Sequence, residues 1–112
     1  MKPLNEKALD AVTDTANSTE IKSDFQVACS VQVVTTSTIA GAVKLQFSND
    51  PQNVAGYPVN WSDIAGATVT LSGSAGVFHI PKTEICYNYM RVVFTKSGGS
   101  GTVTANYHSF AF

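Results

Sequence analysis

Charged side chains are scarce in this sequence of 112 residues, which has seven basic and eight acidic residues and a net charge of −1. Residues 26–80 contain only three charges, on Lys44, Asp50 and Asp63. The basic residues are scattered and form no patch that could neutralise a row of phosphates, so we expect no binding to nucleic acid. A polar surface with so few charges has two interpretations: it belongs to a Ser/Thr-rich domain that stays free, or it is covered in an assembly.

Long hydrophobic runs are absent as well. No segment approaches the length needed to cross a bilayer, and the charged start at residues 1–7 has no apolar segment behind it. We therefore expect no signal peptide, no membrane anchor and no membrane partner, and synthesis in the cytoplasm of a cell.

The sequence lacks the residue patterns of common catalytic and cofactor sites. His79 and His108 are the only histidines, and no spacing of His, Cys, Asp or Glu supplies the three or four ligands of a metal site. No serine lies in a nucleophile elbow. The glycine-rich residues 97–101 join two β-type runs rather than opening a helix, so they predict no phosphate-binding loop. We expect no metal, no cofactor and no enzymatic activity.

Only two cysteines occur, Cys29 and Cys86, and each lies in an apolar run. In a small secreted domain such a pair suggests a disulfide bridge, whereas in a protein made in the cytoplasm it favours two buried free thiols. We favour free thiols. Trp61 lies between the two cysteines, as a tryptophan does in immunoglobulin domains, but its distance from Cys29 does not fit that family.

Valine and threonine are abundant, with thirteen Val and twelve Thr against four Leu, which favours pleated strands over helices. Apolar residues alternate over 25–33 and again over 43–47, which predicts two strands with one buried face each. Pro51 ends the second of them, because proline cannot donate to a strand ladder. Three shorter runs bounded by glycine or proline predict further strands, at 60–64, 67–71 and 77–80.

These elements predict an all-β fold of a single domain, an antiparallel two-sheet β-sandwich with jelly-roll or immunoglobulin-like topology. Residues 24–112 form the sandwich in this prediction. Residues 1–23 alternate only weakly, and we expect them to form an N-terminal arm outside it.

The last third of the chain has two β-type runs, 86–96 and 102–112, on either side of the glycine- and serine-rich residues 97–101. This arrangement predicts a long closing hairpin. Both faces of the first run are partly apolar, which indicates a strand that is covered on both sides.

Two aromatic residues near the end of the chain, Phe110 and Phe112, are out of phase with the apolar residues that begin the last run. An extra residue in a strand shifts the alternation of its side chains by one position. We therefore expect a β-bulge near His108 or Ser109.

Three segments carry a resemblance to a known family. They are Leu-Gln-Phe-Ser-Asn-Asp at 45–50, Asn-Trp-Ser-Asp-Ile at 60–64 and Cys-Tyr-Asn-Tyr-Met-Arg-Val-Val-Phe at 86–94. The chain from residue 25 to residue 112 resembles small β-sandwich structural proteins of tailed bacteriophages. Within the third segment, Arg91 is placed to set its guanidinium against a tyrosine ring or a carboxylate of a partner.

The resemblance implies a structural protein of the virion that is made in the host cytoplasm. Most simply it implies a capsid decoration or cement protein, which binds the major capsid protein or another virion protein and forms homo-oligomers on the particle. A tail- or fibre-associated module is the other role that the resemblance allows.

The expected assembly contacts lie near the two ends of the chain. Leu4, Leu9 and Val12 are apolar residues of the expected arm, which would lie along a neighbouring subunit. Phe110 and Phe112 would fill a pocket in a partner. The alternative is that the two phenylalanines close the core of this domain itself.

A carbohydrate-binding or adhesive module is the alternative function. Sugar sites on β-sandwiches combine exposed aromatic rings with Asn and Asp side chains that bind hydroxyl groups. Six such side chains occur close together in the sequence: Asn49, Asp50, Asn53, Tyr57, Asn60 and Trp61. A tryptophan in a short strand is more typical of a core, so the position of Trp61 distinguishes a core residue from a sugar-binding platform.

Overall fold

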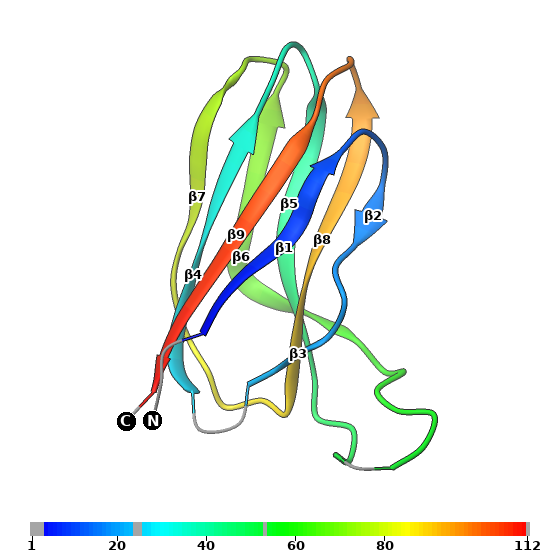
Figure 1. Ribbon diagram of the computed structural model, residues 1–112, viewed down its shortest axis with the longest axis vertical. Coiled ribbons are helices and arrows are strands. Elements are labelled where there is room, and N and C mark those ends of the chain that lie inside the picture. Colours follow the sequence, from blue (N-terminus) through cyan, green and yellow to red (C-terminus); the bar gives the residue numbers. More distant parts are fainter. Residues whose placement is uncertain (1–3, 24–25, 53, 112) are drawn as a thin grey trace.

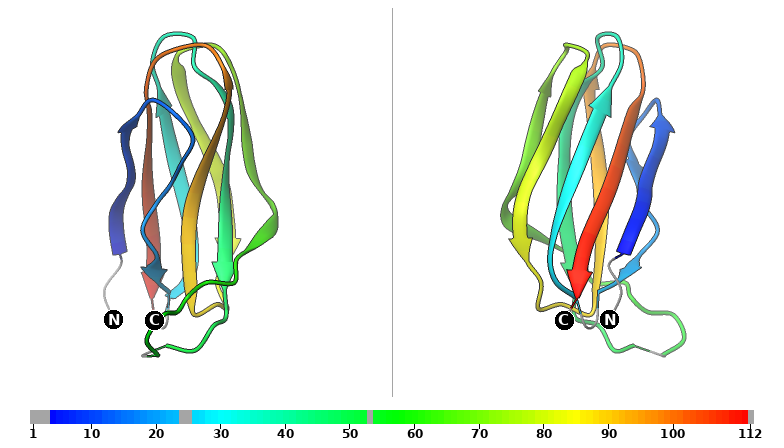
Figure 2. Two further views of the ribbon diagram at one scale, coloured as in Figure 1. Left: turned by 90° about the vertical axis from the view of Figure 1, so that its right-hand side faces the viewer. Right: turned by 60° about the vertical axis from the view of Figure 1, so that its left-hand side comes forward.

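The structure, a computed structural model, describes residues 4–23, 26–52 and 54–111. It consists of two antiparallel sheets packed face to face, which confirms the predicted all-β sandwich (Figures 1 and 2). No helix of the described residues is long and apolar enough to cross a membrane.

Sheet A contains the strands β1 (Leu4–Val12), β9 (Val103–Ala111), β4 (Gln26–Thr35) and β7 (Gly76–Glu84), in that order. Sheet B contains β2 (Ala16–Asn17), β8 (Tyr89–Gly98), β5 (Ala40–Ser48) and β6 (Ser62–Ser72), and the short β3 (Ile21–Lys22) also pairs with β8. Both sheets therefore combine strands from the two ends and the middle of the chain. This strand order is that of a jelly roll, which decides between the two topologies that the sequence left open.

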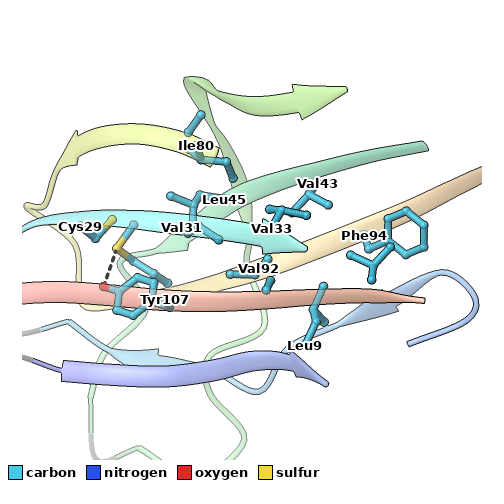
Figure 3. Close-up of a cluster of buried hydrophobic side chains, with 14 of the residues drawn as sticks. Leu9, Cys29, Val31, Val33, Val43, Leu45, Ile80, Val92, Phe94 and Tyr107 are labelled. Carbon is cyan, nitrogen blue, oxygen red and sulfur yellow. Dashed lines mark hydrogen bonds between the residues drawn. The ribbon is translucent and has the colours of Figure 1, made fainter. Parts of the chain in front are cut away.

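The core lies between the sheets and is made by the alternating side chains of the predicted strands (Figure 3). Val31 and Val33 of β4, with Val43 and Leu45 of β5, are at most 1% exposed. Burying an aliphatic side chain of this size stabilises the fold by about 1.5–3 kcal/mol.

Strand β8 is covered on both sides, as predicted for residues 86–96. Val92 and Phe94 point into the core, and Tyr89 and Val93, of opposite parity in the strand, are buried as well. β8 lies in the interior of sheet B, with β5 on one side and β2 and β3 on the other. The burial of side chains on both faces accounts for a run in which neither face is fully polar.

The N-terminal segment is not an arm over residues 4–12, which corrects the prediction. It forms β1, an edge strand of sheet A that runs antiparallel to β9, and Leu9 is only 2% exposed. The register between the two strands shifts twice, between Lys7 and Leu9 and between Leu9 and Val12. Such shifts interrupt the two-residue alternation of side chains, so the alternation in the sequence is weaker than in a regular strand.

Strands β8 and β9 do not pair with each other, so the predicted closing hairpin is wrong. β8 pairs with β5 in sheet B, and β9 pairs with β4 and β1 in sheet A. The connection between them crosses from one sheet to the other at one end of the sandwich (Figure 1). There Thr38 N donates to Ser100 O at 2.9 Å and Thr36 N donates to Thr102 O at 3.0 Å. A flexible glycine-rich segment suits a hairpin and a crossing equally, so its composition did not distinguish them.

The expected β-bulge at His108 or Ser109 is also absent. Alternation in β9 continues through Ser109, which is 0% exposed, and this turns Phe110 outward. The register shift lies in the partner strand instead, where Val27 of β4 is the extra residue. Phe110 is 51% exposed and so does not close the core of its own domain.

Strands β6 and β7 are longer than predicted. The two runs at 60–64 and 67–71 belong to one strand, β6, which has a register shift against β5 and a positive φ at Gly66. Pro81, which was expected to end the run at 77–80, lies inside β7. β7 is the edge strand of sheet A, where a backbone without an N–H group is tolerated.

Candidate functional site

The expected assembly contacts separate into buried and exposed residues. Leu9 belongs to the core, and Leu4 and Val12 pack against it. These three side chains hold β1 on the sandwich; Leu9 is not free to bind a neighbouring subunit, whereas Leu4 and Val12 stay partly exposed. Phe110 is exposed on the outer face of sheet A, whereas Phe112 lies outside the described residues.

Phe110 stands between two shallow hollows on sheet A. We give the name Phe110 surface to seven of the residues that line them: Ala28, Ser30, Glu84, Ile85, Cys86, His108 and Phe110. Ala28 lies opposite Phe110 in the register of β4 and β9 and offers only a methyl group beside the ring. An aromatic ring that is half exposed and flanked by hollows can still bury a large apolar area against a partner.

Beside Phe110, the outer face of sheet A carries uncharged side chains that are hydrogen-bonded to one another. Nδ1 of His108 and Oδ1 of Asn5 are 2.7 Å apart, and Nδ2 of Asn106 donates to Oε1 of Gln32 at 3.2 Å. His79 lies opposite Gln32 on β7. Within the residues that the structure describes, no three His, Cys, Asp or Glu side chains are grouped so as to hold a metal ion.

Both cysteines are free thiols, as the sequence favoured. Cys29 is buried, and this burial raises the pKa of its thiol to about 11, although a hydrogen bond with Tyr107 acts in the opposite direction. Cys86 is exposed and belongs to the Phe110 surface. The two thiols therefore differ in their access to solvent reagents.

The connection between β5 and β6, residues 49–61, is held together by Asp50. Its Oδ2 accepts hydrogen bonds from the backbone N–H groups of Val59 and Asn60, both at 2.8 Å, and its Oδ1 accepts one from Nδ2 of Asn60 at 3.0 Å. The bonds from the side chain and backbone of Asn60, followed by that from Val59, lower the pKa of Asp50 to about 2. We call this segment the β5–β6 loop; it extends beyond the end of the sheets (Figure 1).

Asn49 also holds this loop, because its Oδ1 accepts a hydrogen bond from the backbone N–H of Asn88 at 3.1 Å. Three of the six expected sugar ligands, Asn49, Asp50 and Asn60, thus form bonds within the protein. Tyr57 is 44% exposed, and Asn53 lies outside the described residues. Asn49, Asp50 and Asn60 therefore lie in one loop, and their polar atoms are engaged in hydrogen bonds that hold that loop.

Trp61 ends the β5–β6 loop and is half-buried, outside the main core cluster. Cζ of Arg91 lies 4.5 Å from the centre of the Trp61 ring, which is a cation–π contact. Nε of Arg91 donates to Oε1 of Gln46 at 2.8 Å. Burial lowers the pKa of the Arg91 guanidinium. The tryptophan is therefore not a core residue, and a guanidinium covers one of its faces.

A row of polar side chains continues from Arg91 across sheet B. Nε2 of Gln46 donates to Oδ1 of Asp63 at 2.8 Å, and Nζ of Lys44 lies 3.1 Å from Oδ2 of Asp63. The hydrogen bond from Gln46, and then that from Lys44, lower the pKa of Asp63. We call this set the Trp61–Arg91 cluster: Lys44, Gln46, Trp61, Asp63 and Arg91.

Sequence reasoning missed this cluster as a unit. Gln46 stands opposite Arg91 in β8 and opposite Asp63 in β6, so three distant segments meet only when the register of sheet B is known. The sequence signal was limited to isolated charged residues, Lys44, Asp63 and Arg91, in three separate segments, and to the single tryptophan Trp61.

Comparison with known proteins identifies relatives by fold alone. No family model matches the chain, and no curated protein matches it by sequence. The solved structure of the SPBc2 prophage-derived protein YomS is similar at a TM-score of 0.61 and 14% identity, over 96% of this chain and 91% of YomS. The chitosan-binding module 1 of a chitosanase/glucanase from Paenibacillus sp. IK-5 is similar at a TM-score of 0.51 and 20% identity, over 92% of this chain and 74% of that one. At these identities the comparisons establish a shared β-sandwich.

Proposed function

We propose that this protein is a non-enzymatic structural component of a phage virion, a capsid decoration protein that binds the major capsid protein or another virion protein. The observation that carries the proposal is the Phe110 surface, where an aromatic ring that the fold leaves half exposed stands between two hollows. In this proposal the protein acts through contact area alone and forms oligomers on the particle.

The chemistry of sheet A favours a protein partner. Aromatic side chains at the centre of an interface contribute most of its binding energy when a partner excludes water from them. Glu84 is the only acidic residue of the Phe110 surface, so little charge has to lose its hydration on binding. The hydrogen-bonded pairs Asn5 with His108 and Gln32 with Asn106 suit the polar rim of such an interface.

The fold supports the same proposal at a coarser level. YomS, a prophage-derived protein, shares the fold over nearly the full length of both chains. A jelly roll is also an architecture that viral capsid proteins use. Neither likeness names a partner, so the proposal depends on a binding experiment.

Co-sedimentation with undecorated capsid shells of the parent phage tests the proposal. We expect saturable binding of the wild-type protein at a fixed ratio to the major capsid subunit. Phe110→Ser should weaken binding by about tenfold or more, as loss of a central aromatic does. Val77→Ser is the matched control, because Val77 is 66% exposed on the same face of sheet A but outside the Phe110 surface. Shells that sediment without the wild-type protein would overturn the proposal.

A carbohydrate-binding module is the second candidate, and Trp61 is the observation that favours it. The ring is half-buried against Arg91, which is hydrogen-bonded to Gln46, and Gln46 is in turn bonded to Asp63; such polar side chains are of the kind that bind sugar hydroxyls. Chitosan-binding modules share the fold. Binding to a glycan array that is lost in Trp61→Ala and kept in Phe110→Ser would support this candidate over the first.

A further inference from the structure

The Arg91 guanidinium occupies a fixed position on the outer side of sheet B. It lies over the Trp61 ring, with Cζ 4.5 Å from the ring centre, and it is half-buried. Its Nε donates to Oε1 of Gln46 at 2.8 Å, which sets the direction of the planar group. An arginine held by a ring face and one hydrogen bond loses little further freedom when it binds a ligand.

Most hydrogen-bond donors of this guanidinium have no protein acceptor among the described residues. In the described part of the chain, its one hydrogen bond is that from Nε, and the two terminal amino groups donate to no protein atom. The ion pairs among described residues are Lys7 with Asp10 and Lys44 with Asp63, and neither includes Arg91. Two adjacent N–H-bearing nitrogens of an arginine match the two oxygens of a carboxylate.

The charges of the Trp61–Arg91 cluster favour a monovalent anion. Lys44 and Arg91 carry two positive charges and Asp63 carries one negative charge, so the net charge of the cluster is +1. Asp63 is already engaged by Gln46 and Lys44. A single carboxylate would therefore neutralise the cluster, whereas a phosphate dianion would leave it negative.

The surroundings of the cluster favour a protein over a sugar as the source of that carboxylate. Arg91 covers a ring of Trp61, so that face is not available to stack on a pyranose. The β5–β6 loop also carries Val59, which is 61% exposed, and Tyr57, which is 44% exposed. A loop with exposed tyrosine and valine side chains that ends in a tryptophan covered by an arginine has the composition of a protein-binding hot spot.

We propose that Trp61 and Arg91, with Tyr57 and Val59 of the β5–β6 loop, form a docking site for an Asp or Glu side chain of a partner protein. The inference rests on the proposed function, since it assumes a virion partner. It also extends that function: the Phe110 surface lies on the outer face of sheet A and Arg91 on that of sheet B, so one molecule can contact two subunits at once. Bridging of neighbouring subunits is what a cement protein requires.

A fluorescence titration tests the docking site without any capsid. Trp61 is the only tryptophan of the chain, so its emission reports on the Arg91 contact. The probes are acetylated and amidated Leu-Glu-Leu, the same peptide with Gln in place of Glu, and glucuronate. We expect the Glu peptide to change the emission saturably and to bind about tenfold or more tightly than the Gln peptide.

Variants assign this preference to Arg91. Arg91→Gln should abolish the difference between the Glu and Gln peptides, and its unfolding midpoint shows whether the fold is kept. Lys22→Gln is the control, because it removes an exposed positive charge from β3, next to β8 in sheet B, and should keep the difference.

Three outcomes would overturn the inference: equal responses to the two peptides, a preference that survives Arg91→Gln, or tighter binding of glucuronate than of the Glu peptide. The last outcome would assign the site to acidic sugars. Co-sedimentation of Phe110→Ser and of wild type with shells is an independent experiment, so failure of the docking site and failure of the decoration function are distinguishable.

Discussion

Asn60 donates hydrogen bonds to both carboxylate oxygens of Asp50, one from its backbone N–H to Oδ2 at 2.8 Å and one from its side-chain Nδ2 to Oδ1 at 3.0 Å. The two residues close the β5–β6 loop across ten positions of the chain. The ionised carboxylate of Asp50 therefore fixes the second half of the loop, while Asn49 and Asn88 hold the first half.

We predict that the loop loosens in acid. The hydrogen bonds lower the pKa of Asp50 from 3.8 to about 2. Because the pKa is lower in the folded state than in the unfolded chain, the stabilisation is fully present above about pH 4 and is lost as the pH falls through 2. The backbone amide protons of Val59 and Asn60, followed by NMR, should shift over this range. In Asp50→Asn these shifts should be absent, and a shift of equal size there would contradict the assignment.

Gly99 allows a close approach that a side chain would prevent. Its φ is +73°, and a Cβ added there would overlap the backbone carbonyl of Thr38. We expect Gly99→Ala to lower the free energy of unfolding by about 2 kcal/mol or more, measured by urea denaturation. Gly98→Ala is the matched control, because nothing lies within 4 Å of a Cβ at Gly98, and it should change stability by less than about 0.5 kcal/mol. Equal effects of the two substitutions would contradict the crossing of this segment over the β4–β5 connection.

Leu9 tests whether the N-terminal segment belongs to the sandwich. Leu9→Ala should lower the free energy of unfolding by about 2–5 kcal/mol, because it leaves a cavity in the core. Leu4→Ala should have a smaller effect, since Leu4 is only half-buried at the start of β1. If thermal and urea unfolding of Leu9→Ala match those of the wild type, the segment is a free arm after all.

The two thiols should react at very different rates. At pH 8 an aromatic disulfide reagent should modify one cysteine per folded chain rapidly, because Cys86 is exposed and the burial of Cys29 raises its thiol pKa to about 11. In urea both should react. Cys86→Ser should remove the rapid phase and Cys29→Ser should keep it; the reverse result would mean that the burial of the two residues is exchanged.

The parts of the fold that depend on local pattern were predictable. The alternation around Val31 and Val33 and around Val43 and Leu45 reflects a strand with one buried face, which any pleated sheet of this kind imposes. The same residues therefore predicted the two central strands and the sandwich class. Both cysteines are free, as expected, but only Cys29 is buried; Cys86 is exposed, which corrects the prediction of two buried thiols.

Other features depend on which strands pair, and residue pattern does not carry that information. Residues 86–96 and 102–112 read as a hairpin because they flank a glycine-rich turn, yet they belong to opposite sheets. The weak alternation of residues 4–12 hid an edge strand, because its register against β9 shifts twice. The sequence left open whether Phe110 closes the core or faces outward; the structure leaves its ring 51% exposed, and the register shift expected near His108 or Ser109 lies in β4 instead.

The sequence by itself determined the class of fold, since strand propensity and a two-residue period are local properties of the chain. Tertiary structure alone decided which side chains meet on the surface and which are exposed there. The meeting of Trp61, Arg91 and Gln46 requires β5 and β8 to pair in one register, and a shift of one residue would turn Arg91 toward the core. The half-exposed ring of Phe110 likewise follows from the pairing of β9 with β4. The register of the two strands places the ring on the outer face of sheet A.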